Sequence, residues 1–149
     1  MKILMVCLGN ICRSPLAEGI LKSKIERESL DWTVDSAGTS SWHIEEIPHK
    51  GSIAIAKENG IDITNQRGRQ FSVRDFEEFD LILAMDSENY QNIVQLAKDK
   101  LQEVKVELLL NYAYPGSNMA VPDPYYTGDF QEVYDLLDLA CANLMAELR

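Results

Sequence analysis

The sequence predicts an α/β protein with three layers, in which helices cover both faces of a parallel sheet. The first reason is that strand-like apolar runs alternate along the chain with helix-like segments, the order expected for crossovers between parallel strands. The second is that 149 residues with a hydrophobic fraction of 46% suffice for one domain, residues 1–149, with a substantial core.

The first strand and the first helix have clear signals. Residues 2–6 form an apolar run that predicts a buried strand. Residues 15–28 predict a helix, with Ser14 as N-cap and Pro15 at the first helical position. The further expected elements, in order, are a strand at 32–36, a helix at 48–59 ended by Gly60, a strand at 79–84, a helix at 86–97 and a strand at 104–109.

The last helix is the most clearly marked element. Asp129 and Glu132 form a start that resembles a capping box. Apolar side chains then recur every three or four positions, the period of an amphipathic helix. These side chains are Phe130, Val133, Leu137, Cys141, Leu144 and Leu148.

The composition argues against nucleic acid and membrane partners. The chain carries 24 acidic and 14 basic residues, a formal net charge of −10, which disfavours binding to a polyanion. No apolar run approaches the roughly 18 residues that a membrane helix needs. The N-terminus lacks the pattern of a signal peptide. We therefore expect a cytoplasmic protein.

The cysteines and histidines do not form a recognisable metal or disulfide pattern. Three cysteines and two histidines lack the spacing of a structural zinc site or of a disulfide framework. Reduced cysteines and no metal are therefore expected.

The loop after the first strand is the strongest functional signal. Cys7 and Arg13 stand at its two ends, and a helix start follows directly. If the loop curls, its backbone N–H groups converge on one anion. The positive end of the helix dipole attracts the same anion, and the Arg13 guanidinium can donate two hydrogen bonds to it. Gly9 and Asn10 tolerate the positive φ that a tight loop requires. The predicted phosphate-binding loop comprises Leu8, Gly9, Asn10, Ile11, Cys12 and Arg13.

The same surroundings favour the thiolate form of Cys7. Helix N-termini and nearby arginines stabilise a thiolate, and the Ser14 hydroxyl is placed to donate a further hydrogen bond to the sulfur. A thiolate held among N–H donors is poised for in-line attack on phosphorus, which gives a cysteinyl-phosphate. A Cys and an Arg at this spacing arise easily by chance, so the prediction rests on the strand before them and the helix start after them.

A candidate acid lies near the other end of the chain. Asp123 stands between Pro122 and Pro124, which restrict its backbone and present its carboxyl group stiffly beside two aromatic rings. Taken alone, this segment reads as an ordinary turn. Paired with the Cys7 loop, it supplies the general acid that the departure of an alkoxide or phenoxide needs.

These two motifs resemble the low molecular weight protein tyrosine phosphatases. The motifs are the segments 7–15 and 123–126, and further matches occur at 35–39, 60–61, 69–70, 79–80 and 84–86, so that the resemblance covers essentially the whole chain. It implies a single phosphatase domain with the phosphotyrosine phosphatase I-like fold, a four-stranded parallel sheet with helices on both faces.

The resemblance also implies roles for individual residues. Cys7 would be the nucleophile, Arg13 the clamp for phosphate and transition state, and Asp123 the acid that protonates the leaving oxygen and then activates water. The Ser14 hydroxyl would support the thiolate. The implied substrate is a protein that carries phosphotyrosine, and neither metal nor another cofactor is required.

A supporting network is implied around Asn10, whose side chain would hold the loop through contacts that include Ser36. The family has a histidine in this network where the present chain has Gln66. An amide donates and accepts hydrogen bonds as a neutral imidazole does. The network can therefore persist with Gln66, and we expect its pH dependence to differ; how Gln66 is bonded stays open.

Aromatic and apolar side chains predict the substrate class. Trp42, Tyr125 and Tyr126 are candidate walls for a phenyl ring, although each is also compatible with ordinary packing. Leu8 and Ile11 project from the loop. The related protein-arginine phosphatases typically have threonine at the position of Ile11, so that this residue favours an aryl phosphate.

Two alternatives remain for the cysteines. The resemblance implies that Cys12 forms a reversible disulfide with Cys7 under oxidation, but a small buried side chain is an equally good explanation. A redox enzyme such as arsenate reductase, which has a similar loop, needs further relay cysteines, and none occurs between Cys12 and Cys141. A phosphate-binding module without catalysis would not need Cys7 or Asp123.

Overall fold

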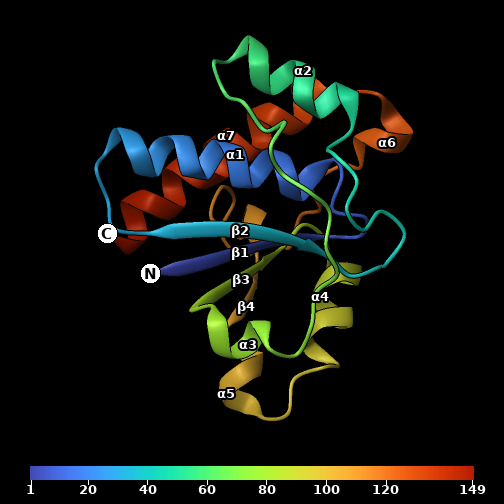
Figure 1. The fold of residues 1–149 in the computed structure, drawn as a ribbon. Helices are drawn as coiled ribbons and strands as arrows, with labels where there is room; N and C mark the ends of the chain where they lie inside the picture. Colours follow the sequence, from blue (N-terminus) through green and yellow to red (C-terminus); the bar gives the residue numbers. More distant parts are fainter.

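Four parallel strands form the centre of the computed structural model, which describes residues 1–149 (Figure 1). The spatial order is β2-β1-β3-β4. Val6 of β1 lies opposite Ala37 of β2 on one side and Ala84 of β3 on the other. The predicted four-stranded parallel sheet is confirmed. The strands are β1 (Lys2–Cys7), β2 (Thr33–Gly38), β3 (Leu81–Ala84) and β4 (Val106–Leu108).

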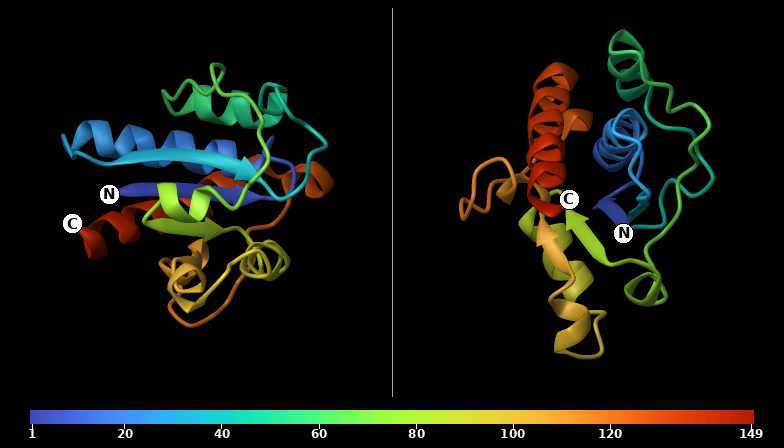
Figure 2. Two further views of the ribbon diagram at one scale, coloured as in Figure 1. Left: turned by 60° about the horizontal axis from the view of Figure 1, so that its bottom comes forward. Right: turned by 90° about the vertical axis from the view of Figure 1, so that its left-hand side faces the viewer.

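Helices cover both faces of the sheet, which gives the three predicted layers (Figures 1 and 2). One face is covered by α1 (Arg13–Arg27), α7 (Phe130–Leu148) and, packed beyond α1, α2 (Lys50–Glu58). The opposite face packs against α3 (Asp75–Glu78) and α4 (Ser87–Val94). Shorter elements are α5 (Lys100–Glu103), the 3₁₀ turn η1 (Leu109–Asn111) and α6 (Pro124–Thr127).

The alternation of side chains along β1 divides the core in two. Ile3 and Met5 point to the face of α1 and α7, while Leu4 and Val6 point to the face of α3 and α4. All four are fully buried. A strand between two helical layers needs apolar residues at every position, which is why 2–6 reads as a continuous apolar run.

The start of α1 differs from the prediction. The helix begins at Arg13, its N-cap is Cys12, and no side chain caps it. Ser14, predicted as the N-cap, lies inside the first turn and is completely buried. The prediction was wrong because the Ser14 hydroxyl has tertiary partners, Asn10 and Cys7, and these outweigh the local preference of serine for a cap.

Other helix ends follow capping chemistry. Asp129 accepts a hydrogen bond from the Glu132 N–H at 3.0 Å, as the capping box predicts. The second helix begins two residues later than expected, because the His49 ring accepts from the Gly51 N–H at 2.9 Å and thereby acts as N-cap. The short elements α3, α5, α6 and η1 were not predicted, since three or four residues are too few for a periodic pattern. None of the helices combines the length and the apolar character that crossing a membrane requires.

The carboxyl ends of three neighbouring strands position the functional loops. Cys7 ends β1, Gly38 ends β2, and Asp86 follows β3. The loop after Cys7 packs so closely on β2 that a Cβ atom at Gly38 would lie 2.9 Å from the carbonyl oxygen of Leu8. Ligands in open parallel sheets bind at this edge. The fold thus places the predicted phosphate-binding loop where a ligand site is expected.

Candidate active site

The loop between β1 and α1 is held by the side chain of Asn10. The Asn10 backbone has a φ of 57°, in the left-handed region that asparagine tolerates better than most residues. Its amide nitrogen donates to the hydroxyls of Ser14 at 2.8 Å and Ser36 at 3.0 Å. Its carbonyl oxygen accepts from the backbone N–H of Arg69 at 3.0 Å. One buried side chain therefore ties the loop to α1, to β2 and to the segment after α2.

Gln66 is not part of this network. Its amide nitrogen donates to the carbonyl oxygen of Pro15 at 3.1 Å, and its carbonyl oxygen is buried without a hydrogen-bond partner. The question left open by the sequence is thus decided: the partner of the Asn10 carbonyl oxygen is the backbone N–H of Arg69, and the Asn10 network persists without Gln66.

Cys7 lies at the bottom of the loop, where two polar groups contact its sulfur. The thiol is 3% exposed. Its sulfur is 3.1 Å from the Ser14 hydroxyl oxygen and accepts from the Asn10 N–H at 3.3 Å. The N–H groups of Gly9, Ile11 and Cys12 donate to no other protein atom, so they are available to an anion in front of the sulfur.

Arg13 is held rigidly beside Cys7. Its Nη1 donates to the Asp86 carboxylate at 2.8 Å and to the carbonyl oxygen of Val121 at 3.0 Å. Burial opposes the charged form, but the Cys7 sulfur and the bond to Asp86 keep the pKa of Arg13 above its ordinary value. The guanidinium is therefore a fixed cation in a buried position.

Asp86 was not identified from the sequence. Its carboxylate orients Arg13, and it also caps α4 by accepting from the Asn89 N–H at 2.7 Å. The signal that could have identified Asp86 is its place shortly after a predicted strand, since ligands bind at the carboxyl ends of parallel strands.

Asp123 reaches the same site from the other end of the chain. Its backbone is extended, as expected between two prolines, and it caps the short helix α6. One carboxylate oxygen accepts from the Tyr125 N–H at 3.1 Å, and the other is 3.6 Å from Nη2 of Arg13. A hydrogen bond from the Val121 N–H to the carbonyl oxygen of Met85 anchors this segment to the end of β3.

A cavity of about 160 Å³ lies above the loop and brings the predicted residues together. Trp42, Tyr125 and Tyr126 form its rim, with exposed fractions of 68%, 57% and 76%. The rings of the two tyrosines meet edge to face at 5.4 Å. The remaining lining residues are Cys7, Leu8, Gly9, Ile11, Cys12, Arg13, His43 and Asp123.

Both histidines lie near this cavity, although the sequence assigned neither a role. His43 lines the cavity, packs against Gly9 and is 3.1 Å from the Glu46 carboxylate. The His49 ring stacks on Phe130 and meets Tyr125 edge to face. Neither position carries a local motif, so that only the tertiary packing reveals them.

All three cysteines are free thiols. Burial and the neighbouring Cys7 raise the pKa of Cys12 to about 12, so this thiol stays protonated at neutral pH. Cys141 lies on α7 and is completely buried in the hydrophobic core, and this burial raises the pKa of its thiol to about 12. The structure contains no group of three His, Cys, Asp or Glu side chains arranged to hold a metal ion.

The comparison with known proteins identifies the family. The model of the family described as low molecular weight phosphotyrosine protein phosphatase matches residues 2–149. The chain belongs to this family. It is therefore a protein-tyrosine-phosphatase of the low molecular weight type, which is metal-independent.

Individual relatives of this phosphatase agree over nearly their whole length. A putative low molecular weight protein-tyrosine-phosphatase of Synechocystis is 46% identical, over 99% of this chain and 96% of that protein. The crystal structure of YfkJ from Bacillus subtilis matches with a TM-score of 0.94 at 40% identity, over 99% of this chain and 94% of that one. A Drosophila arginine phosphatase matches with a TM-score of 0.92 at 35% identity, over 100% and 98% of the two chains.

The Asn10 network predicts a specific pattern of stability loss in this phosphatase. The change Asn10→Gly keeps the left-handed backbone accessible but removes three hydrogen bonds, and it should lower the free energy of unfolding by about 2 kcal/mol. The change Asn10→Ala removes the same bonds and adds backbone strain, so its loss should be larger by about 1 kcal/mol. Urea denaturation measures both. Equal stability of wild type and Asn10→Gly would contradict the bridging role.

Proposed function

We propose that this phosphatase removes phosphate from phosphotyrosine in protein substrates through a cysteinyl-phosphate intermediate. The observation that carries the proposal is that Asp123, from near the other end of the chain, lines the same cavity as Cys7 and Arg13 of the loop after β1. Each has the chemistry that one step of a metal-independent phosphomonoester hydrolysis requires.

In the first step the phosphate group enters the loop above Cys7. The free N–H groups of the loop and the Arg13 guanidinium bind its non-bridging oxygens and stabilise the charge that they carry in the transition state. The thiolate attacks phosphorus in line, and an S–P bond forms while the bond to the ester oxygen breaks. Asp123 gives its proton to that oxygen, and the tyrosine hydroxyl leaves neutral.

In the second step the roles of Asp123 reverse. Its carboxylate takes a proton from a water molecule, whose oxygen attacks the phosphorus. The S–P bond breaks, inorganic phosphate leaves, and the Cys7 thiolate is restored. Ser14 supports the thiolate at both ends of the cycle, since its hydroxyl lies 3.1 Å from the sulfur.

The shape of the cavity favours an aryl phosphate. Its rim consists of aromatic side chains, which match the faces of a phenyl ring. Ile11, which is buried at the wall of the cavity, offers no polar group to a guanidinium. Because the fold is also that of an arginine phosphatase, phosphoarginine is the alternative substrate, and a substrate comparison must test it.

A redox function fits the cysteines less well. Disulfide relay needs a further cysteine that can reach the loop, and Cys141 is fully buried in the core on α7. Three free cysteines, one of them the proposed nucleophile, suit the reducing conditions of the cytoplasm, where we place the protein.

The role of Cys7 predicts the strongest loss of activity. The variant Cys7→Ser should retain its fold but lose hydrolysis of 4-nitrophenyl phosphate by about a thousandfold or more, because a serine hydroxyl is not ionised in this loop. Release of 4-nitrophenol measures the rate, and thermal unfolding checks the fold. Cys141→Ala is the control, with activity near that of wild type. Full activity of Cys7→Ser would refute the mechanism.

The role of Asp123 predicts a dependence on the leaving group. The variant Asp123→Asn should slow the hydrolysis of phosphotyrosine by about a hundredfold, because the poor leaving group needs a proton. Hydrolysis of an ester with a good leaving group should slow much less. The matched control is Asp129→Asn, which removes one exposed carboxylate six positions away and keeps a helix cap. Equal slowing with both substrates would show that Asp123 does not protonate the leaving group.

The cavity walls predict the order of substrates. The kcat/KM for phosphotyrosine should exceed that for phosphoserine and phosphoarginine by at least about tenfold. The variant Ile11→Thr should shift the ratio towards phosphoarginine, because the hydroxyl gives a guanidinium a partner. If phosphoarginine were the best substrate of the wild type, the proposed specificity would be wrong.

A further inference from the structure

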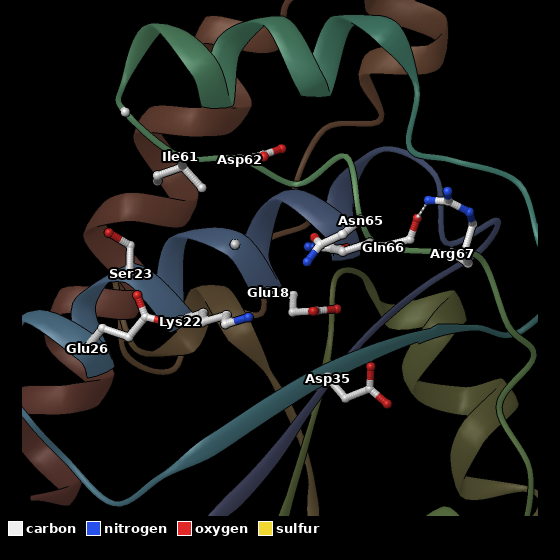
Figure 3. A pocket seen from close by; sticks show the side chains of 12 residues that line it. Glu18, Lys22, Ser23, Glu26, Asp35, Ile61, Asp62, Asn65, Gln66 and Arg67 are labelled. Carbon is white, nitrogen blue, oxygen red and sulfur yellow. Dashed lines mark hydrogen bonds between the residues drawn. The ribbon is translucent and has the colours of Figure 1, made fainter.

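A second cavity, of about 480 Å³, lies behind the active-site loop, between α1, β2 and the segment after α2 (Figure 3). Its lining is almost entirely polar. Glu18 projects from α1 into the space between this helix and β2, with Asp35 on β2 close by (Figure 3). Glu18 is the residue that connects this cavity to the nucleophile.

The connection is a continuous chain of hydrogen bonds. The Ser36 hydroxyl donates to the Glu18 carboxylate at 2.6 Å. The Asn10 amide nitrogen donates to Ser36 at 3.0 Å and to Ser14 at 2.8 Å. The Ser14 hydroxyl oxygen lies 3.1 Å from the Cys7 sulfur. Four bonds therefore join the Glu18 carboxyl group to the sulfur.

The direction of each bond follows from the donors available. The Asn10 amide uses its two hydrogens on the two serine oxygens, so both serines accept from it. Each serine then has one hydrogen left. An ionised Glu18 is an acceptor only and takes the hydrogen of Ser36. The hydrogen of Ser14 has two acceptors within reach, the Cys7 sulfur at 3.1 Å and the carbonyl oxygen of Ala37 at 3.4 Å.

A protonated Glu18 does not fix this direction. A neutral carboxyl group donates as well as accepts, and its bond with Ser36 lacks the strength of a charge-assisted hydrogen bond. Asn10 and Glu18 then compete for the oxygen of Ser36. The bond from Asn10 to Ser36 is thereby weakened, and with it the hold of Asn10 on Ser14 beside the sulfur.

We propose that Glu18 is a positioning residue, whose ionisation fixes the hydrogen-bond chain and makes Cys7 more reactive. The proposal rests on the role of Cys7 as the nucleophile. It adds a part to the site that lies outside the substrate cavity and that neither the loop motif nor the acid motif contains.

The surroundings of Glu18 place its titration near neutral pH. Glu18 takes part in none of the ion pairs of the structure, and the Gln66 side chain in the same cavity is neutral. Burial raises the pKa of Glu18 to about 7, since the hydrogen bond from Ser36 only partly opposes it and the charge of Asp35 adds to it. The other charged groups that face this cavity or act on Glu18 are Lys22 and Glu26 on α1, and Asp62, Arg67 and Arg69 in the segment after α2.

Arg69 does not neutralise Glu18, because it is engaged elsewhere. Its guanidinium forms two bonds of 3.1 Å with Asp75 and lies 3.2 Å from Asp35. As the pH rises through the pKa of Glu18, the carboxyl group loses its proton. The hydrogen-bond chain then becomes ordered, and Cys7 reacts faster.

The test measures Cys7 without a phosphate ester. The full chain is alkylated with iodoacetamide between about pH 5.5 and 8.5 in a buffer free of phosphate, and mass spectrometry quantifies modification at Cys7. Carbon-13 NMR of the side-chain carboxyl groups follows Glu18 directly, assigned by the signal that Glu18→Gln removes. The alkylation rate of the wild type should show a step that coincides with the titration of Glu18.

The variants separate this role from a structural one. In Glu18→Gln, which keeps an acceptor for Ser36 but cannot ionise, the step should vanish and the rate at pH 8 should fall about threefold. Ser36→Ala, which cuts the chain and leaves Glu18 in place, should also lose the step. Glu26→Gln, which removes a carboxylate from the same cavity, should keep it.

Three results would overturn the proposal: a step that persists in Glu18→Gln, a wild type without the step, or a Glu18 that titrates in the ordinary carboxyl range. A lower melting temperature of Glu18→Gln with an unchanged alkylation profile would assign it a structural role only. Because alkylation uses no phosphate ester, a chain that hydrolyses none would refute the proposed function while leaving this measurement able to decide on Glu18.

Discussion

The turn from β1 into α1 is the constraint on which the rest of the site depends. Asn10 holds it in a left-handed conformation, and its buried side chain bonds to α1, to β2 and to the segment after α2. The N–H groups of Gly9, Ile11 and Cys12 in the same loop have no partner within the protein. A loop whose backbone donors are unpaired is stable only when other contacts fix it, and Asn10 supplies them.

Local charge, not net charge, makes this acidic protein suited to an anion. The chain has a formal net charge of −10, yet the proposed phosphate site presents a helix start, free N–H groups and one rigid arginine. Asp86 and the carbonyl oxygen of Val121 hold that arginine in place. Dipoles and one fixed cation at contact distance outweigh carboxylates that lie farther away in water, whose fields are screened.

The supporting network reaches farther than the loop. Gln66 bonds to Pro15 outside the Asn10 network, and the hydrogen-bond chain from Cys7 ends at the partly buried carboxyl group of Glu18. The fold itself is kept at 40% identity, with a TM-score of 0.94 to the structure of YfkJ from Bacillus subtilis. Outer hydrogen-bond partners tune a reactive group without themselves contacting the substrate.

The sequence by itself determined the sheet, its layers and the two motifs that meet in the site, because apolar periodicity and turn chemistry are local properties. It placed the last helix and its cap correctly, and it pointed to Cys7, Arg13 and Asp123 as a group. Only the tertiary structure decided that Ser14 lies inside the helix, that Asp86 orients Arg13, that Gln66 leaves the Asn10 network and that Glu18 joins it. These outcomes depend on contacts between residues far apart in the chain, where burial and competition for hydrogen-bond partners outweigh local preference.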